Sequence, residues 1–226
     1  MATYFITGID TDIGKTYATA MLAKTLQASG KTVITAKLAQ TGCQGISEDI
    51  KLHRKIMGID LLAEDIASLT CPYIFDMPAS PHLAARSQGK TIDPQVIINS
   101  INQLQQSYDV VLVEGVGGLL VPLNDKVLSI DIVASQNWPM IIVSSPRLGS
   151  INHTLLTLEA AHNRNCKVAG IIYNMHQQST PAITEDTKKV ILAYLKKYNG
   201  NAALVELPTI TDIDNPPKTN LCCLID

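Results

Sequence analysis

The densest group of chemically useful side chains lies in residues 8–16, GIDTDIGKT, directly after the first apolar run. Gly8 and Gly14 bound a short loop, and Lys15 and Thr16 then open an alanine- and leucine-rich stretch that predicts a helix. Backbone amides at such a helix N-terminus face a bound anion, the lysine adds a mobile cation, and the threonine hydroxyl can bind Mg²⁺. The segment therefore predicts a phosphate-binding loop.

Two features set this loop apart from the general phosphate-loop pattern. Five residues separate Gly8 from Gly14, where the general pattern has four, so a strand-to-helix turn with an incidental lysine is the competing interpretation. Asp10 and Asp12 would repel phosphate unless they face a metal ion, a water or a substrate amine. Their presence favours a site that handles more than a bare nucleotide.

Carboxylates suited to metal binding follow at two later points in the chain. Glu114 ends the predicted strand 110–114 and precedes a glycine-rich turn, where it can hold Mg²⁺ directly or through water. In isolation it would be an ordinary strand-end acid. Asp49 lies near the start of a predicted helix, a position that the helix dipole also favours for a carboxylate without any metal. Both are candidate metal ligands, together with Thr16.

Three further polar residues end predicted strands or follow them. Lys37 ends the strand 33–37 and could neutralise charge on a transferred phosphoryl group, the alternative being a solvated strand-end lysine. Thr41 follows in a loop that can present a hydroxyl and amides to a substrate. Asn174 follows the strand 168–173, where its amide can satisfy a donor and an acceptor on adenine. Taken alone, it is also typical of a turn or a helix cap.

Aliphatic runs of strand length alternate with longer stretches of helical spacing along the chain. Strands are predicted at residues 4–7, 33–37, 110–114, 140–144, 168–173 and 203–207, and helices at about 15–28, 48–57, 81–88, 94–106, 150–163 and 181–198. The alternation predicts an α/β fold, a mainly parallel sheet with helices on both faces. Ligands of such sheets bind beyond the carboxyl ends of the strands, where the polar residues above are expected to gather.

Composition and charge fit this fold class and exclude several others. The 226 residues are 46% hydrophobic, 17% charged and only 4% aromatic, which predicts an aliphatic core and excludes disorder, collagen and coiled coil. A formal net charge of −2 disfavours nucleic acid and anionic membranes as partners. No linker, charge block or repeat divides the chain. We expect a single domain over residues 1–226, with a loose polar tail from about residue 212.

Several other kinds of signal are missing from the sequence. No basic leader precedes the first apolar run, and no stretch approaches the roughly 18 apolar residues of a membrane span, so we expect a cytoplasmic protein. The cysteines are odd in number and lack metal-ligand spacing, which predicts reduced thiols at Cys43, Cys71, Cys166, Cys222 and Cys223. We interpret three histidines as helix-face or loop residues: His53, His162 and His176.

Five segments together resemble the dethiobiotin synthetase family in their order and nearly in their spacing. They are GIDTDIGKT (8–16), KLAQTG (37–42), SPHLAA (80–85), VEGVGGLLVPL (113–123) and LGSINHTLLT (148–157). The resemblance extends to about Pro208, and the extra residue of the phosphate loop is the family's own form. It implies a P-loop NTPase-type fold with a mainly parallel, seven-stranded sheet, in a homodimer.

The resemblance implies a reaction in which 7,8-diaminononanoate, CO2 and MgATP give dethiobiotin, ADP and phosphate. One substrate amine captures CO2 as a carbamate, the γ-phosphoryl group of ATP converts it into a carbamic-phosphoric anhydride, and the second amine closes the ureido ring. These species concentrate negative charge. Lysines, loop amides and Mg²⁺ can stabilise that charge without a protein nucleophile.

The resemblance also implies a role for each matching residue. Catalysis would rest on Lys37, Lys15 and Thr11. The nucleotide would be bound by Asp12, Ile13, Gly14, Lys15, Thr16, Tyr17, Asp49, Glu114, Gly117, Asn174 and Pro208, and Mg²⁺ by Thr16, Asp49 and Glu114. The substrate would be bound by Thr41 and Gly117 and, from the second subunit, by the helix start Leu148, Gly149, Ser150, Ile151 and Asn152, whose amides receive the substrate carboxylate.

Some residues depart from the family pattern. After Lys37 the family commonly has proline and then small residues leading to a serine, whereas this chain has Leu38, Gln40 and Thr41. The threonine keeps the hydroxyl, but the bulk of Gln40 changes the expected shape of the substrate loop. Val116 stands where alanine is usual between the glycines. None of these changes removes a charged group that the chemistry needs.

Two other classes of protein are the alternatives. An ATP-gated dimeric switch of the partition or septum-positioning type shares this sheet, but such proteins typically carry an additional lysine near the start of the phosphate loop, and residues 8–12 contain none. An amidating ligase acting on a cobyrinate-like acid usually brings a glutaminase domain with a nucleophilic cysteine. This chain has neither the length nor the motif for one.

Overall fold

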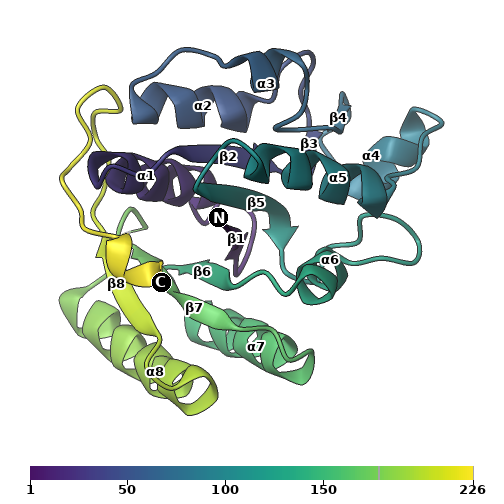
Figure 1. The fold of residues 1–226 in the computed structure, drawn as a ribbon. Coiled ribbons are helices and arrows are strands. Elements are labelled where there is room, and N and C mark those ends of the chain that lie inside the picture. The colour runs from purple at the N-terminus through teal and green to yellow at the C-terminus, as the bar shows by residue number, and fades with distance from the viewer. Residues whose placement is uncertain (178, 226) are drawn as a thin grey trace.

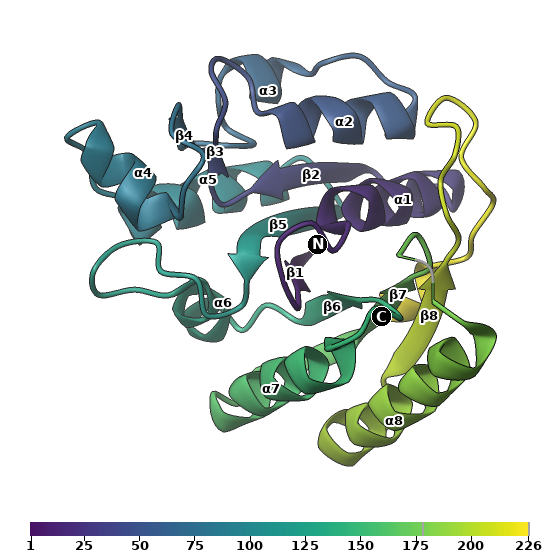
Figure 2. The same cartoon turned by 180° about the vertical axis from the view of Figure 1, so that it is seen from behind.

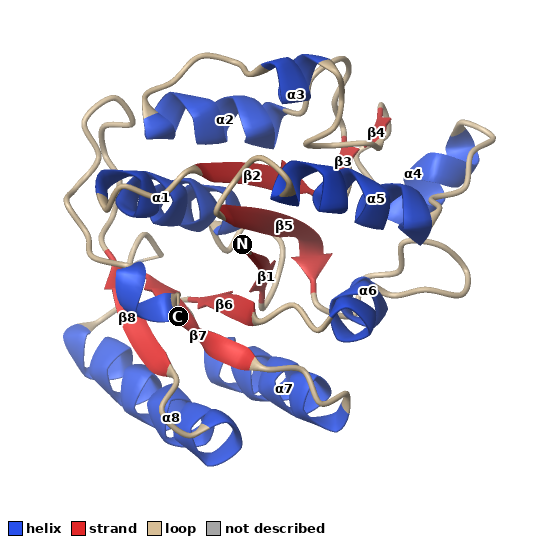
Figure 3. Cartoon of the chain, viewed as in Figure 1, coloured by secondary structure: helices blue, strands red, loops and turns tan. Residues whose placement is uncertain are grey.

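A parallel six-stranded sheet forms the centre of the protein, which is described here from a computed structural model covering residues 1–177 and 179–225. Its strands, in the order β2-β5-β1-β6-β7-β8, are all parallel (Figures 1 and 3). They are β1 (Ala2–Gly8), β2 (Val33–Lys37), β5 (Val110–Gly118), β6 (Met140–Ser144), β7 (Val168–Asn174) and β8 (Ala203–Leu207).

Helices pack on both faces of this sheet, as the two opposite views show (Figures 1 and 2). Helix α1 packs against β1, β2 and β5, while α5 packs on β5, α7 on β6 and α8 on β7. The helices are α1 (Lys15–Ala28), α2 (Glu48–Met57), α3 (Ala63–Ile66), α4 (Pro81–Ser87), α5 (Pro94–Gln105), α6 (Ser129–Gln136), α7 (Ser150–Asn163) and α8 (Pro181–Asn199). The predicted α/β fold class is confirmed.

The sheet holds together because its central strands are aliphatic on both faces. Every residue of β2 and β6 is buried, as are residues 110–115 of β5. Valine and isoleucine suit this setting, since branched side chains pack well on a pleated surface covered by helices. The polar exceptions in these three strands include Thr35 in the middle of β2 and Lys37, Glu114 and Ser144, which lie toward the carboxyl side of the sheet.

The expected count of seven strands in the sheet is wrong by one. The segment 70–75 runs beside the edge strand β2 and makes a backbone hydrogen bond with it: the amide of Lys37 donates to the carbonyl of Thr70 at 2.7 Å. However, Pro72 has no N–H to offer a ladder. The segment instead forms a separate two-stranded parallel pair, β3 (Gln40–Thr41) with β4 (Ile74–Phe75).

The end of the chain returns to the sheet. No helix or strand is assigned to residues 208–221, which are followed by a 3₁₀ turn at Cys222–Leu224 (η1). Leu221 and Leu224 are buried, and the hydroxyl of Thr25 donates to the carbonyl of Thr219 at 3.2 Å. Over the described part of the chain, none of the helices has the length and apolar character needed to span a bilayer.

Candidate active site

A cleft of about 840 Å³ opens at the carboxyl ends of β1, β2, β5 and β7. It gathers most of the predicted site residues from segments far apart in the sequence. The predicted residues that line it are Thr11, Asp12, Gly14, Lys15, Thr16, Tyr17, Lys37, Thr41, Asp49, Glu114, Gly117, Asn174 and Pro208. The cleft therefore lies where ligands bind in open parallel sheets.

The phosphate loop joins the end of β1 to the start of α1. Gly14 precedes the helix with a φ of +94°, and a Cβ atom there would lie 2.3 Å from Nδ2 of Asn174, so only glycine fits. Asn174 donates from this nitrogen to the carbonyl of Ile13 at 2.8 Å, which ties the end of β7 to the loop. Lys15 is buried and donates from Nζ to the carbonyl of Asp10 at 2.9 Å. The lysine is thus held over the loop.

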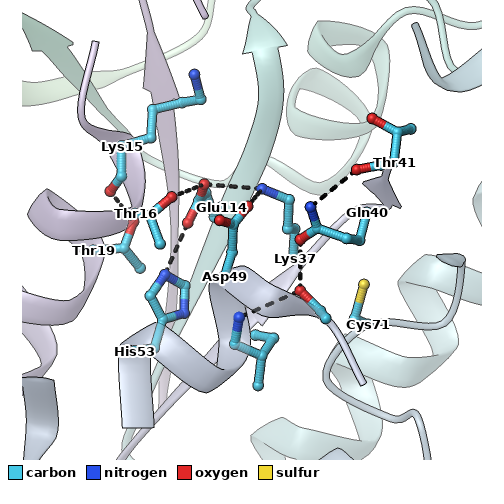
Figure 4. Close-up of polar contacts among 12 residues, drawn as sticks. Lys15, Thr16, Thr19, Lys37, Gln40, Thr41, Asp49, His53, Cys71 and Glu114 are labelled. Carbon is cyan, nitrogen blue, oxygen red and sulfur yellow. Dashed lines mark hydrogen bonds and ion pairs between the residues drawn. The ribbon is translucent and has the colours of Figure 1, made fainter. Parts of the chain in front are cut away.

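The strand order brings together two charged candidates that are 77 positions apart in the sequence. Strands β2 and β5 are neighbours, and Lys37 pairs with Glu114 in their register. The Nζ atom of Lys37 lies 3.0 Å from Oε1 of Glu114 and also contacts the Asp49 carboxylate from α2 (Figure 4). The same Oε1 accepts from the hydroxyl of Thr16 at 3.1 Å. One cluster therefore joins the phosphate loop, the end of β2, the middle of β5 and a helix start. The prediction that Glu114 ends its strand is wrong, because β5 continues to Gly118.

The protein fixes the charge of this cluster. Burial alone would raise the pKa of Glu114, but Lys37, with His53 and Lys15, holds it far below its ordinary value. Burial alone would lower the pKa of Lys37, but Glu114 and Asp49 hold it above its ordinary value. Burial lowers the pKa of Lys15, and the nearby Lys37 cation lowers it further against the opposing pull of Glu114. Lys15 is thus the cation that gains most from a bound anion.

The donor set of the cluster fits a magnesium ion held together with phosphate. Asp49, Glu114 and Thr16 offer only oxygen atoms, and Mg²⁺ is usually bound by one or two carboxylates plus substrate phosphates and water. Within residues 1–177 and 179–225, no group of three or more His, Cys, Asp or Glu side chains could hold a metal by itself. Two carboxylates and a hydroxyl beside a phosphate loop match a metal that arrives with a nucleotide.

The loop after β2 is tied to the start of α2 through Gln40. Its Oε1 accepts from the hydroxyl of Ser47 at 2.7 Å, and the Ser47 oxygen in turn accepts from the amide of Ile50 as the N-cap of α2. Asp49 stands in the first turn of that helix. The bulky Gln40 therefore both lines the cleft and holds the helix start that carries Asp49.

Two groups of predicted residues do not line the cleft. Ile13 belongs to the phosphate loop and is fully buried. The segment 148–152 lies at the start of α7, outside the cleft lining, with the Leu148 side chain 97% exposed. Next to this segment, Arg147 contacts the Asp10 carboxylate and, with burial opposing it, lowers the pKa of that group. The predicted acid in the phosphate loop thus faces an arginine of its own chain.

Sequence reasoning missed several residues that shape the site. His53, interpreted as a helix-face or loop residue, is fully buried and lies 2.8 Å from Glu114 through Nε2. It follows Asp49 by four positions on α2, and this spacing puts both on one helix face. Arg147 gave no local signal, because its contact with Asp10 joins residues 137 positions apart.

The chain is similar to known proteins over most of its length. A family model described as an AAA domain matches residues 2–217. The ATP-dependent dethiobiotin synthetase BioD of Chlorobaculum tepidum is 51% identical over 205 residues, which are 90% of this chain and 86% of that protein. The ATP-dependent dethiobiotin synthetase BioD 2 of Pasteurella multocida is 48% identical, over 88% of this chain and 93% of that protein.

Solved structures resemble the fold at much lower identity. The MinC:MinD cell division protein complex of Aquifex aeolicus matches with a TM-score of 0.57 and 17% identity, over 92% of this chain and 81% of that chain. A ParA family ATPase of Chlorobium tepidum matches with a TM-score of 0.56 and 13% identity, over 93% and 86% of the two chains. These likenesses show the fold alone, whereas the close relatives show the family. The chain belongs to the ATP-dependent dethiobiotin synthetase family.

Proposed function

We propose that this protein is an ATP-dependent ligase that carboxylates and cyclises 7,8-diaminononanoate to dethiobiotin. One amine adds to CO2 and loses a proton to give a carbamate. A carbamate oxygen then attacks the γ-phosphorus of ATP, and ADP leaves. The second amine attacks the carbamoyl carbon, phosphate leaves, and the ureido ring is closed. The observation that carries the proposal is the cluster of Lys15, Lys37, Asp49 and Glu114 beside a phosphate loop in a chain of this family.

The phosphate loop binds the triphosphate in this proposal. Amides at the start of α1, which follow Gly14, face the phosphates, and the buried ammonium of Lys15 exchanges a backbone carbonyl for phosphate oxygens. Thr16, Asp49 and Glu114 would hold the nucleotide's Mg²⁺. When bound, that ion neutralises charge that develops on the phosphoryl oxygens.

Lys37 serves the chemical step. Its Nζ is buried and fixed by two carboxylates, so its charge is in place before the substrate arrives. A preorganised charge of this kind stabilises the carbamate and the phosphoryl group in transit without reorganising in the transition state. Thr11 and Thr41, on opposite loops of the same cleft, offer hydroxyl groups to the carbamate and the substrate.

Asn174 and Pro208 place the adenine in this proposal. Both line the cleft beside the phosphate loop. The Asn174 amide uses one N–H on Ile13, and its oxygen accepts from the amide of His176 at 3.1 Å. A side-chain amide has two N–H groups and two oxygen lone pairs, so one of each remains for the base.

The second subunit completes the substrate site. The segment 148–152 lies outside this chain's own cleft, and its leucine projects into solvent at the start of α7. That arrangement supports a homodimer in which each helix start receives the carboxylate of a substrate bound mainly by the other subunit. Leu148→Glu should shift the protein from dimer to monomer in light scattering and raise the KM for the diamine. An unchanged dimer with an unchanged KM would contradict this arrangement.

The reaction is tested by isotope transfer. Purified protein is incubated with the diamine, MgATP and ¹³C-bicarbonate, and the product is analysed by mass spectrometry. The proposal predicts dethiobiotin with one ¹³C atom in its ureido carbonyl, formed only when ATP is present. Lys15→Ala is the matched control and should form little product. Absence of labelled product with all three substrates present would contradict the proposal.

A further inference from the structure

His53 contacts a residue of the site from the protein interior, outside the cleft. It lies on α2, its exposed fraction is 0%, and it is not part of the cleft lining. Its Nε2 atom lies 2.8 Å from Oε2 of Glu114, and its Nδ1 atom lies 3.0 Å from the hydroxyl oxygen of Thr35 on β2. Figure 4 shows the ring reaching the carboxylate from the side opposite Lys37. The imidazole therefore connects the carboxylate to the interior of the protein.

The partners of the two ring nitrogens decide which of them carries the proton. Arg54 binds both oxygens of Asp65 at 2.8 Å and donates from Nη1 to the Thr35 hydroxyl at 2.7 Å. Arginine can only donate, so the Thr35 oxygen is the acceptor in this contact. Among the described residues, the only other partner of that hydroxyl is Nδ1 of His53. The ionised Glu114 carboxylate can only accept, so Nε2 of His53 carries a proton and donates to Oε2. The Thr35 hydroxyl then points its own proton at Nδ1, the one acceptor it has among the described side chains.

This polarity fixes how Glu114 faces the cleft. With the proton on Nε2, His53 donates to Oε2, and that oxygen is held on the buried side. The other oxygen, Oε1, is the one that contacts Thr16 at 3.1 Å and Lys37 at 3.0 Å. One carboxylate oxygen thus faces the protein interior, and the other faces the cleft. A carboxylate held in this way cannot rotate without breaking a buried hydrogen bond.

We propose that His53 is a positioning residue for Glu114, and that the chain of contacts from Arg54 through Thr35 sets its tautomer so that Oε1 faces the metal-nucleotide. This inference rests on the proposed function, because Glu114 serves the metal there. Outer partners of this kind commonly contribute 10- to 100-fold to metal affinity or activity, since they orient the groups that bind the ion.

A matched pair of variants separates positioning from packing. In His53→Gln the side-chain nitrogen can reach the place of Nε2 and donate to Glu114. In His53→Asn the shorter amide ends near the place of Nδ1 and keeps only the contact with Thr35. The affinity for Mn²⁺ in the presence of ADP is measured by electron paramagnetic resonance, and the stability of each variant by thermal unfolding.

We expect His53→Asn to weaken Mn²⁺ binding by about 10-fold or more and His53→Gln to stay within about 3-fold of the parent protein. Equal affinity in both variants, or losses that follow the unfolding temperature and not the position of the amide, would overturn the inference. The readout needs no diamine, so it does not depend on the cyclisation reaction.

A third variant keeps this test distinct from the test of the site itself. Glu114→Gln should weaken Mn²⁺ binding at least as much as His53→Asn. If Glu114→Gln leaves the affinity unchanged, the metal role proposed for Glu114 is wrong, and the inference fails with it. If Glu114→Gln weakens binding and His53→Asn does not, only the inference about His53 is wrong.

The tautomer is tested directly by nitrogen NMR of the labelled imidazole in the folded protein. The expected spectrum places the His53 proton on Nε2 and leaves Nδ1 bare, in the parent protein and in Thr35→Ser, which keeps the hydroxyl. A proton on Nδ1 in the parent protein would overturn the proposed chain of contacts.

Discussion

Replacing Lys37 by methionine removes its charge while keeping the length of the side chain. The Lys37 side chain is only 6% exposed, and its Nζ contacts Asp49 and Glu114. Removing one partner of a buried ion pair costs about 3–5 kcal/mol, because the remaining charge is left without compensation. We expect Lys37→Met to lower the free energy of unfolding by that order, because it leaves two carboxylates uncompensated, of which Glu114 is the more deeply buried.

The same variant should lose most of its turnover. A preorganised charge that acts on the developing transition state typically contributes about 10²- to 10³-fold to kcat, or about 2.7–4 kcal/mol. Lys15 and the loop amides remain in place to bind the triphosphate, so the KM for ATP should change much less than kcat. Initial rates of ADP release at saturating diamine, bicarbonate and ATP measure kcat, and urea unfolding at neutral pH measures stability.

Two further variants separate charge balance from catalysis. Lys37→Met combined with Asp49→Asn removes one of the two uncompensated carboxylates, so part of the lost stability should return while kcat stays low. Lys37→Gln should not restore the rate, because an uncharged amide does not supply the same field. Turnover at the level of the parent protein in Lys37→Met would refute the reasoning, and Lys37 would then be a purely structural partner of the two carboxylates.

Three other perturbations test separate parts of the account. Lys15→Ala should weaken MgATP binding by about 1.5–3 kcal/mol in calorimetry, because that is the usual contribution of a hydrogen bond from a charged group. An unchanged affinity would show that the phosphate site is assigned to the wrong loop. Gly14→Ala should lower the unfolding temperature and abolish nucleotide binding, because its φ is +94° and the added Cβ would lie 2.3 Å from Asn174. Burial alone would raise the pKa of Asp65, but Arg54 holds it below its ordinary value, so this carboxylate stabilises the fold above about pH 4 and loses that effect as the pH falls through its folded pKa. Asp65→Asn should therefore cost about 3–5 kcal/mol in urea unfolding at pH 7, and the cost should shrink progressively as the pH is lowered below about 4. A cost that does not change with pH in that range would contradict this assignment.

The sequence alone predicts the regular elements well where their periodicity is strong. The ranges expected for β2, β6, α1, α2 and α7 match the observed ones to the residue. Helix α6 is not predicted from the sequence, because the helix has only eight residues and several of them are β-branched. Its start is set by a contact that spacing alone does not reveal: Asp131 accepts from the amide of Leu128 at 2.8 Å.

The site residues also fall into those that a local motif predicts and those that depend on tertiary packing. The phosphate loop is a local motif, so residues 8–16 indicate it directly. Lys37 and Glu114 are 77 positions apart and meet only because β2 and β5 are neighbours, and the strand order depends on tertiary packing. The role of His53 depends on a chain of buried contacts through Thr35, which becomes visible only when helix α2 is placed against the sheet.

The resemblance to a known family added what spacing could not supply. By its local sequence Asp49 is equally well an ordinary helix-start acid or a metal ligand, and the family pattern favours the second interpretation. The structure places it against Lys37 at the mouth of the same cluster. The departure at Gln40 has a physical explanation as well, since its amide oxygen accepts from the Ser47 cap of α2.

The most direct test of the central claim is the coupling of ATP hydrolysis to the diamine and CO2. ADP release is measured with both 7,8-diaminononanoate and bicarbonate, with each alone, and with neither. The account predicts rapid release only when both are present, with one ADP formed per dethiobiotin. A switch ATPase of the same fold would hydrolyse ATP at the same rate in all four mixtures, and that result would contradict the account.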